Sequence, residues 1–242
     1  MAESSAYAQS EEYYDAIYET FKDYSKESRL IRKLIGRHKK SRDRSLLDIA
    51  CGTGRHLSYL RKWFTVEGLD ADPKMLTIAR KRNPQIRFHR ANMVKFQLPY
   101  KYDAITCLFS AIGYVRTLSK LRASIRSMAR HLKPGGVLIV EPWLTPQAYK
   151  RGHVGAVFVK QPKLKIARID IAKKRGRVST MIFHYLVGTP DGIKYFTEPH
   201  KLGMFTRNEY LTAFRDCGLK VAYYSKGLTG RGIYVGMKPV NA

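Results

Sequence analysis

Two kinds of hydrophobic pattern alternate along the chain after residue 45. Short apolar runs predict β-strands at 46–50, 65–69, 85–89, 102–107 and 136–140. Between these runs, apolar residues recur every three or four positions, which predicts helices near 55–63, 73–82 and 117–131. Strands that alternate with helices indicate an α/β fold, a parallel sheet with helices on both faces. Ligands of such sheets bind at the carboxyl ends of the strands.

The pattern changes to near-strict alternation of apolar and polar residues between 154 and 201. Turn residues interrupt it at Gln161-Pro162, at 174–176 and at 189–192. Alternation bounded by such turns predicts antiparallel hairpins. A helix is expected again at 207–216, followed by strands at 219–224 and 232–237. The hairpins therefore form an insertion within the α/β domain.

The first 44 residues predict helices that precede the sheet. Tyr14, Ile17, Tyr18 and Phe21 recur at helical spacing and form one amphipathic face. The tyrosines either pack in the core or belong to a lid whose hydroxyls face a site, and the pattern leaves both interpretations open. Residues 25–44 continue as a helix, with its apolar positions, Leu30, Ile31, Leu34 and Ile35, expected inside.

These patterns divide the chain into three parts. We expect an N-terminal helical lid over 1–44, an α/β domain over 45–150 and 202–242, and an antiparallel β insertion over 151–201. No apolar run approaches the roughly 18 residues of a membrane-spanning helix. The polar beginning lacks the apolar core of a signal peptide, and we expect a cytoplasmic protein without membrane contact, either a monomer or a homodimer.

Charge is the unusual feature of the composition. Forty-five Lys and Arg against 19 Asp and Glu give a net charge of +26 over 242 residues. Such an excess suits an anionic partner, although basic residues dispersed over the whole surface would give the same net charge. The three cysteines, Cys51, Cys107 and Cys217, are scattered and odd in number, so neither a disulfide framework nor a metal site is expected.

The first predicted strand runs into a glycine turn, Gly52-Thr53-Gly54, and a helix follows. Glycines let the backbone approach a ligand closely, and a helix N-terminus above a strand favours anionic groups. Asp70 lies 22 residues after Asp48 at the end of the second strand, a separation at which an acid binds a ribose diol. Asp72 is the better candidate for capping the helix that starts at Pro73. A nucleotide-type cofactor is therefore expected.

Longer stretches resemble the N,N-dimethyltransferases of nucleotide-linked amino sugars, which use S-adenosylmethionine (SAM). The matching motifs are YDxxY at 14–18, KDY at 22–24, LLDIACGTGRHL at 46–57, VEGLD at 66–70, MLxxAR at 75–80, FSAIGY at 109–114, HLKPGGVLIVEPW at 131–143, MFTRNEY at 204–210, AFxxxGL at 213–219 and GRGIYVG at 230–236. The EPW and GRG segments are more specific than the glycine turn, and the matches run nearly end to end.

The resemblance implies a Rossmann-like class I SAM methyltransferase sheet with an inserted antiparallel sheet that covers the active site. Residues then expected at SAM are Tyr24, Ala50, Gly52, Thr53, Gly54, Asp70, Ala71, Met75, Asn92, Met93 and Leu108. Residues expected at the acceptor, a nucleotide diphosphate sugar, are Tyr18, Trp143 and Arg231. Ala50 replaces the first glycine of the family loop. Asn92 replaces an Asp that accepts a hydrogen bond from the adenine amino group, and an amide oxygen can accept the same bond.

Methylation of an amine requires the ammonium group to lose a proton first. Tyr14 and Tyr114 are the candidate bases, although a tyrosine with its ordinary pKa near ~10 is a weak base at neutral pH. A purely positional role is therefore equally open for both tyrosines. His56, His153 and His200 are weaker candidates, because a lone histidine is more often structural.

Three other functions compete with this interpretation. An NAD enzyme usually carries a third glycine where this chain has Leu57. An RNA methyltransferase would suit the charge, but the segment after the fourth strand, Leu108–Ala111, has neither the Asn/Asp-Pro-Pro-Tyr/Trp motif of adenine enzymes nor the Pro-Cys of cytosine enzymes. Methylation of another small anionic acceptor remains the third alternative.

Overall fold

A computed structural model describes residue 7 and residues 9–241 of the chain and contains two separate sheets. The larger sheet has seven strands in the order β10-β11-β5-β4-β1-β2-β3. Its members are β1 (Ser45–Ile49), β2 (Thr65–Asp70), β3 (Arg87–Arg90), β4 (Tyr102–Cys107), β5 (Leu132–Val140), β10 (Lys220–Tyr224) and β11 (Ile233–Met237). The first five strands are parallel, and β11 runs antiparallel to both β5 and β10.

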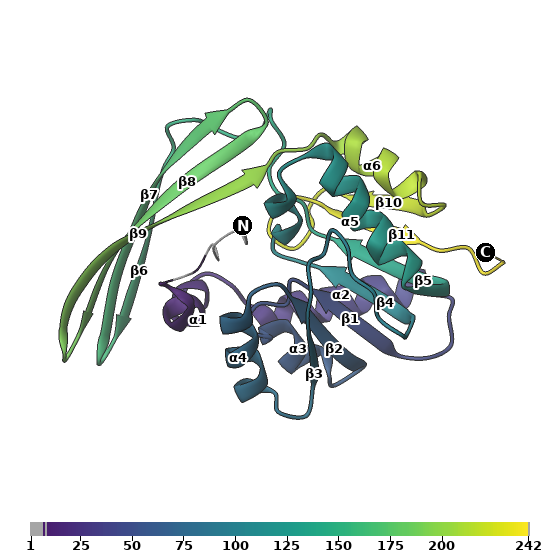
Figure 1. Cartoon of the computed structure of the whole chain (residues 1–242), viewed down its shortest axis with the longest axis horizontal. Helices are drawn as coiled ribbons and strands as arrows, with labels where there is room; N and C mark the ends of the chain where they lie inside the picture. Colours follow the sequence, from purple (N-terminus) through teal and green to yellow (C-terminus); the bar gives the residue numbers. More distant parts are fainter. Residues whose placement is uncertain (1–6, 8, 242) are drawn as a thin grey trace.

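Helices cover both faces of this sheet (Figure 1). One face carries α2 (Tyr24–His38), α3 (Arg55–Leu60) and α4 (Pro73–Arg82), and the other carries α5 (Leu118–Arg130) and α6 (Arg207–Arg215). The strands between them are apolar on both sides, and every residue of β4 is buried. The predicted α/β class is therefore confirmed, and β1 and β2 end at the edge where the site was expected.

Three expectations about single elements were wrong. The helix predicted to continue to residue 44 ends at His38, because no apolar residue follows Ile35 and the backbone turns extended at Lys39. Leu30 lies at the edge of the buried face of α2 and is 37% exposed. The fifth strand begins at Leu132 rather than at 136, since the Pro-Gly-Gly segment follows a strand path along β4 with a bulge.

The second sheet has four antiparallel strands in sequence order. They are β6 (Val154–Gln161), β7 (Leu164–Arg175), β8 (Val178–Thr189) and β9 (Gly192–Gly203), joined by turns at the predicted positions. Alternation sets which residues face the rest of the molecule: Ile166, Phe183 and Tyr185 are buried on one face, while neighbours such as Ile169 and Leu186 are exposed on the other. The sheet projects beside the larger one (Figure 1).

The N-terminal segment lies between the two sheets (Figure 1). It comprises the 3₁₀ turn η1 (Glu11–Tyr13) and the short helix α1 (Tyr14–Tyr18). Tyr13 and Ile17 pack against the inner face of the four-stranded sheet. Phe21, predicted to share the buried face of this segment, is 53% exposed, because the chain leaves α1 before reaching it. No helix among residues 7 and 9–241 is long and apolar enough to cross a membrane.

Candidate functional site

The glycine loop after β1 has the backbone conformation that its residues suggest. Gly52 and Gly54 have φ of 54° and 72°, in the left-handed region that favours glycine. A Cβ on Gly54 would lie 3.0 Å from Nδ2 of Asn83, whereas a Cβ on Gly52 would meet nothing within 4 Å. Ala50 shares this conformation, with φ of 54°, although it carries a side chain. A left-handed alanine costs roughly 1–2 kcal/mol, and this strain lies directly at the loop.

Asp70 holds the glycine loop in place from the end of β2. Its Oδ2 accepts the Gly52 N–H at 2.8 Å, and its Oδ1 accepts the Asp72 N–H at 2.9 Å. Each carboxylate oxygen has a second lone pair, so Asp70 can still accept hydrogen bonds from a ribose. Burial raises the pKa of Asp70. Asp72 caps α4 by accepting the Lys74 N–H at 2.9 Å, which confirms its predicted capping role.

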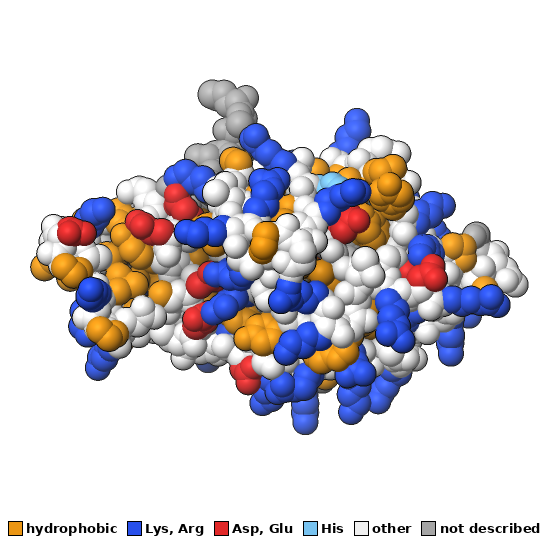
Figure 2. Space-filling view, turned by 90° about the horizontal axis from the view of Figure 1, so that it is seen from below, with side chains coloured by type: hydrophobic (Ala, Val, Ile, Leu, Met, Phe, Trp, Pro, Cys, Tyr) orange, Lys and Arg blue, Asp and Glu red, His pale blue; other side chains and the backbone are white. Residues whose placement is uncertain are grey.

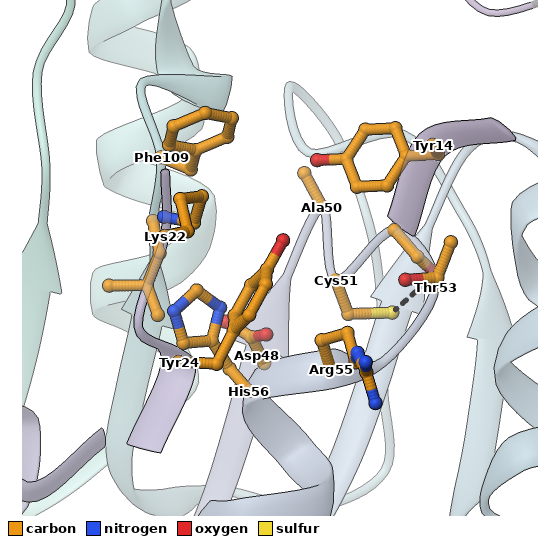
Figure 3. Close-up of a pocket in the computed structure, with 12 residues that line it drawn as sticks. Tyr14, Lys22, Tyr24, Asp48, Ala50, Cys51, Thr53, Arg55, His56 and Phe109 are labelled. Carbon is orange, nitrogen blue, oxygen red and sulfur yellow. Dashed lines mark hydrogen bonds between the residues drawn. The ribbon is translucent and has the colours of Figure 1, made fainter. Parts of the chain in front are cut away.

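A cavity lies above this loop (Figure 3). Its walls are Tyr14, Lys22, Tyr24, Asp48, Ala50, Cys51, Gly52, Thr53, Arg55, His56, Leu108 and Phe109. Six of the residues predicted for a site are therefore in this wall: Tyr14, Tyr24, Ala50, Gly52, Thr53 and Leu108. Gly54 and Asp70 support the loop from behind. Four others lie outside the wall: Met75 is buried in the core, Ala71 and Asn92 are exposed, and Met93 packs partly buried beside the core.

Asp48 is the buried acid of the cavity. Its side chain is 2% exposed and accepts a hydrogen bond from Thr106 Oγ1 at 2.7 Å. Burial raises the pKa of Asp48 to about 6. In Figure 3, Asp48, Arg55 and His56 lie at one end of the pocket and Tyr14 at the other. A cationic ligand in this cavity would be favoured by the Asp48 carboxylate.

A buried ionic cluster beside the cavity was not predicted from the sequence. Lys22 Nζ lies 2.9 and 2.8 Å from the two carboxylate oxygens of Glu27, and His56 Nε2 lies 2.8 Å from Glu27 Oε2. Lys22 Nζ also lies 3.9 Å from the centre of the Phe109 ring. Burial lowers the pKa of Lys22, although Glu27 opposes this effect. The KDY motif was the only available signal, because Glu27 and His56 join Lys22 through tertiary packing alone.

The N-terminal segment is tied to the glycine loop and its neighbouring helices by acidic residues spaced four apart. Asp15 accepts a hydrogen bond from Thr53 Oγ1 at 2.8 Å and pairs with Arg82 of α4. The other ion pairs join Glu11 to Lys74 and Glu19 to Arg55. These contacts put the segment across the cavity, which supports the lid interpretation over simple packing.

The same segment is anchored on the four-stranded sheet. Glu198 of β9 accepts the backbone N–H groups of Gln9 and Ser10 at 2.8 and 3.1 Å. It also accepts the Ser10 hydroxyl at 2.5 Å. Glu198 is 3% exposed, so these hydrogen bonds form in a buried environment. The N-terminal segment therefore contacts the four-stranded sheet as well as the glycine loop and helices α3 and α4 of the α/β domain.

Tyr114 belongs to a chain of polar groups that leads to the same glutamate. Tyr114 lies in the 3₁₀ turn η2 (Ala111–Val115) after β4, and its hydroxyl is 2.8 Å from His200 Nδ1. His200 Nε2 is in turn 3.9 Å from Glu198 Oε2. Burial raises the pKa of Tyr114 and lowers that of His200, so a neutral imidazole faces a protonated phenol. His200 Nε2 has no hydrogen-bond partner within residues 7 and 9–241, so its contact with Glu198 is electrostatic rather than a hydrogen bond.

This geometry changes the ranking of the candidate histidines. His200 was expected to be a weak candidate, but it is 1% exposed and contacts Tyr114. His56 belongs to the Glu27 cluster, and His153 is exposed at the start of the insertion. The ring of Tyr14 packs edge-to-face on that of Tyr7, with ring centres 5.1 Å apart, and the Tyr7 hydroxyl lies 3.2 Å from that of Tyr114. Both candidate bases therefore adjoin one aromatic cluster.

Trp143 and Arg231, predicted at the acceptor, lie together. The Arg231 guanidinium is 4.9 Å from the Trp143 ring centre and 5.6 Å from that of Phe109. Arg231 Nη1 donates to the Ser110 hydroxyl at 2.8 Å, and Trp143 Nε1 donates to Ser179 of β8 at 2.9 Å. Burial lowers the pKa of Arg231. Phe109 therefore borders both the cavity above the glycine loop and the Arg231 site.

Two backbone features after β4 give this region its shape. Phe109 and Ser110 both have positive φ, 49° and 61°. The fully buried Glu141 holds the turn, because it accepts the Phe109 N–H at 2.7 Å and the Thr229 hydroxyl at 2.5 Å. Strain of this kind persists only where surrounding contacts impose it, and it is frequent at functional sites. Across residues 7 and 9–241, no group of three His, Cys, Asp or Glu side chains could hold a metal ion.

Comparison with known proteins gives consistent results. A family model described as a methyltransferase domain matches residues 46–136. The chain is 39% identical to dTDP-3-amino-3,6-dideoxy-alpha-D-glucopyranose N,N-dimethyltransferase of Streptomyces fradiae, over 93% of this chain and 89% of that protein. It is also 39% identical to dTDP-3-amino-3,4,6-trideoxy-alpha-D-glucopyranose N,N-dimethyltransferase of Streptomyces venezuelae, over 89% and 92%.

A solved structure extends the similarity to three dimensions. An amino pentose methyltransferase from Micromonospora echinaspora, determined with SAM bound, superposes with a TM-score of 0.85 at 38% identity. The match covers 94% of this chain and 95% of that one, so it extends over the inserted sheet as well as the α/β domain.

Proposed function

The chain belongs to the family of SAM-dependent N,N-dimethyltransferases of nucleotide-linked amino sugars, and on this basis we propose that it methylates an amino group of a nucleotide diphosphate-linked deoxy sugar. The observation that carries the proposal is the match to two sugar N,N-dimethyltransferases over about nine-tenths of the chain, insertion included. A match confined to the α/β domain would identify the cofactor but not the acceptor.

The cavity above the glycine loop has the properties that SAM requires. The Cβ direction of Gly52 opens into free space, Asp70 keeps acceptor capacity, and Asp48 supplies a buried carboxylate for a cationic ligand. Lys22 and Arg55 in the wall suit the carboxylate of an amino acid. When bound, SAM supplies a methyl group activated by a sulfonium. Residues proposed to hold it are Tyr24, Ala50, Gly52, Thr53, Gly54, Asp70, Ala71, Met75, Asn92, Met93 and Leu108.

The Tyr114–His200 pair offers a route for the proton that the acceptor ammonium must lose. The Tyr114 hydroxyl takes this proton as it gives its own to His200 Nδ1, 2.8 Å away. The imidazolium that forms faces Glu198, which stabilises it. Tyr14 stays an alternative base in the same aromatic cluster, but its raised pKa has no comparable partner to receive a proton. The remaining acceleration comes from holding the amine and methyl close together.

The acceptor site is proposed around Tyr18, Trp143 and Arg231. Arg231 can bind phosphate with charge-assisted hydrogen bonds, and Trp143 gives a flat apolar wall beside it. Tyr18 of the lid contacts Phe109 with ring centres 5.1 Å apart, so it borders both the cofactor cavity and the acceptor site.

RNA methylation is less well supported by the surface. Lys and Arg are scattered over the face shown in Figure 2, with neutral and apolar side chains between them. The basic residues of the insertion, such as Lys173 and Arg175, are exposed on β7. A nucleic acid would require a continuous track of such residues. On this face, the basic residues that give the charge of +26 do not form such a track.

Mass spectrometry of reactions with thymidine or uridine diphosphate amino sugars tests the proposal, with short RNA as competitor. We expect methylated sugar, a loss of most acceptor affinity in Arg231→Ala, and little change when Lys173, Lys174 and Arg175 are neutralised together. An RNA site would instead show an RNA affinity that falls with salt concentration, by about 0.7–0.9 log units per phosphate contact for each log unit of salt. If RNA bound in this way also blocked turnover, and nucleotide sugars gave no product, RNA would be the substrate.

A further inference from the structure

Arg168 of β7 is a buried cation without an ionic partner. It lies on the inner face of the four-stranded sheet and is 6% exposed. Its Nε and Nη1 have no hydrogen-bond partner among residues 7 and 9–241. Within that same part of the chain, no carboxylate forms an ion pair with it. Asp170, two residues along the strand, is the nearest acid in sequence and stays half-buried beside it.

The contacts that Arg168 makes are with aromatic rings and with the Tyr18 hydroxyl, and none of them is an ion pair. Its guanidinium lies 4.4 Å from the Phe183 ring centre and 5.5 Å from that of Tyr18. Cation–π contacts of this kind contribute about 0.5–2 kcal/mol, whereas removing a charged group from water costs several kcal/mol. An apolar side chain of similar size should therefore give a fold that is equally stable or more stable. Residues that lower stability can be kept at functional sites, because activity there is favoured over stability.

Arg168, on the four-stranded sheet, and Arg231, in the loop before β11 of the larger sheet, approach the same pair of aromatic rings. Tyr18 lies over Arg168 and contacts Phe109 at 5.1 Å, and Phe109 in turn lies 5.6 Å from the Arg231 guanidinium. The two arginines therefore flank the Tyr18–Phe109 pair. A diphosphate carries two phosphoryl groups, and each one is matched by a guanidinium with free donors.

We propose that Arg168 is an anion-binding residue that takes one phosphoryl group of the acceptor's diphosphate while Arg231 takes the other. This inference rests on the proposed function, and it adds to the acceptor site a second arginine, which comes from the inserted sheet. Tyr18 covers Arg168 and contacts Phe109, so it borders the diphosphate site that the two arginines would form. Ordering of Arg168 by phosphate would supply the hydrogen bonds that its Nε and Nη1 lack.

Calorimetric binding of thymidine diphosphate and of pyrophosphate to Arg168→Met tests the inference. Loss of charge-assisted hydrogen bonds should weaken both ligands at least tenfold, leave SAM affinity unchanged and leave the melting temperature equal or higher. Arg168→Lys keeps the charge without the guanidinium and should bind with intermediate affinity. Lys173→Met, an exposed cation on the same strand, is the matched control and should bind both ligands as the unmodified protein does.

The possible results separate this inference from the proposed function. Thymidine diphosphate binding by Arg168→Met within twofold of the unmodified protein overturns the inference, even when nucleotide sugars are methylated. A fall in melting temperature accompanied by equal losses of SAM and diphosphate affinity assigns Arg168 a structural role and also overturns it. Pyrophosphate binding that depends on Arg168, without any methylation of nucleotide sugars, supports the anion site and contradicts the acceptor. If the Met variant does not fold, the Lys variant decides by the same comparison.

Discussion

Replacing Asp48 by Asn tests the electrostatics of the cofactor cavity. Asp48 is fully enclosed and its pKa is raised to about 6, compared with an ordinary value of about 3.9. At 1.36 kcal/mol per pKa unit, this difference means that ionised Asp48 lowers the free energy of unfolding by roughly 3 kcal/mol. Asparagine has nearly the same shape, can still accept from Thr106 and is never charged.

The sign of the pH dependence follows from the raised pKa. A carboxyl group that binds its proton more tightly in the folded protein favours folding while protonated. This contribution is complete below pH ~4 and is lost as the pH rises through about 6. Asp48→Asn should therefore match the unmodified protein near pH 4 and exceed it by up to ~3 kcal/mol at pH 8. Its SAM affinity should fall about tenfold, because the cavity loses its buried negative charge.

Asp103 of β4 is the matched control, since it is equally buried but has the opposite shift. Burial alone would raise the pKa of Asp103, but hydrogen bonds from Ser45 and the ion pair with Lys133 outweigh burial and lower it to about 2. Asp103→Asn should thus lose about 2 kcal/mol at pH 8, with the loss disappearing as the pH falls through about 2. It lies outside the cavity wall and should leave SAM binding unchanged.

Urea unfolding followed by circular dichroism at pH 4, 5, 6 and 8, with calorimetric SAM titrations, measures both effects. The reasoning fails if Asp48→Asn is less stable than the unmodified protein at pH 8, or if its stability difference does not change with pH. It also fails if Asp48→Asn and Asp103→Asn change stability in the same direction.

Three further predictions concern the loop and the lid. Ala50→Gly should relieve the left-handed strain of roughly 1–2 kcal/mol, while the greater entropy of its unfolded chain should offset about 0.4–1 kcal/mol of that gain. Its urea midpoint should therefore be equal or higher, whereas that of Gly54→Ala should be lower. A lower midpoint for Ala50→Gly would contradict this reasoning. Asp70→Ala should remove charge-assisted hydrogen bonds worth about 1.5–3 kcal/mol each and weaken SAM at least tenfold in calorimetry, and unchanged affinity would exclude the ribose assignment. Deleting residues 1–20 should impair SAM binding, while far-ultraviolet circular dichroism shows that the core stays folded. Asp15→Asn weakens one partly buried ion pair and should lower SAM affinity about threefold. Full SAM affinity in both variants would mean that the segment only packs against the core and is not a lid.

The fold was largely predictable because its strands carry local signals. Alternation from Val154 to 201 sets the register of four strands, since a slip by one residue would exchange the buried and exposed faces. Helix ends were less predictable, as His38 shows, because the end of α2 depends on what packs against it. Leu30 is apolar and helical but lies beyond the contact face, which only the tertiary structure defines.

The candidate site was predictable only where its parts are close in sequence or match a motif. The glycine loop and Asp70 follow from the spacing of one βαβ unit, and Asp70 does contact Gly52. The Tyr114–His200–Glu198 chain was missed because its two halves lie 86 residues apart and meet through the insertion. Nothing in the sequence pointed to Arg168, because alternation predicts which face of the sheet it lies on but not that it lacks an ion-pair partner there.

The double attachment of the proposed lid should affect the kinetics of repeated turnover. Asp15 fastens the lid to the cofactor loop, and Ser10 fastens it to Glu198 beside the acceptor's proton route. Each methyl transfer ends with a spent cofactor that must leave through the same opening. Opening the lid far enough for that exchange also loosens the acceptor side. When two methyl groups are added, the singly methylated sugar is therefore free to diffuse away between rounds and should accumulate early in the time course, before the doubly methylated product.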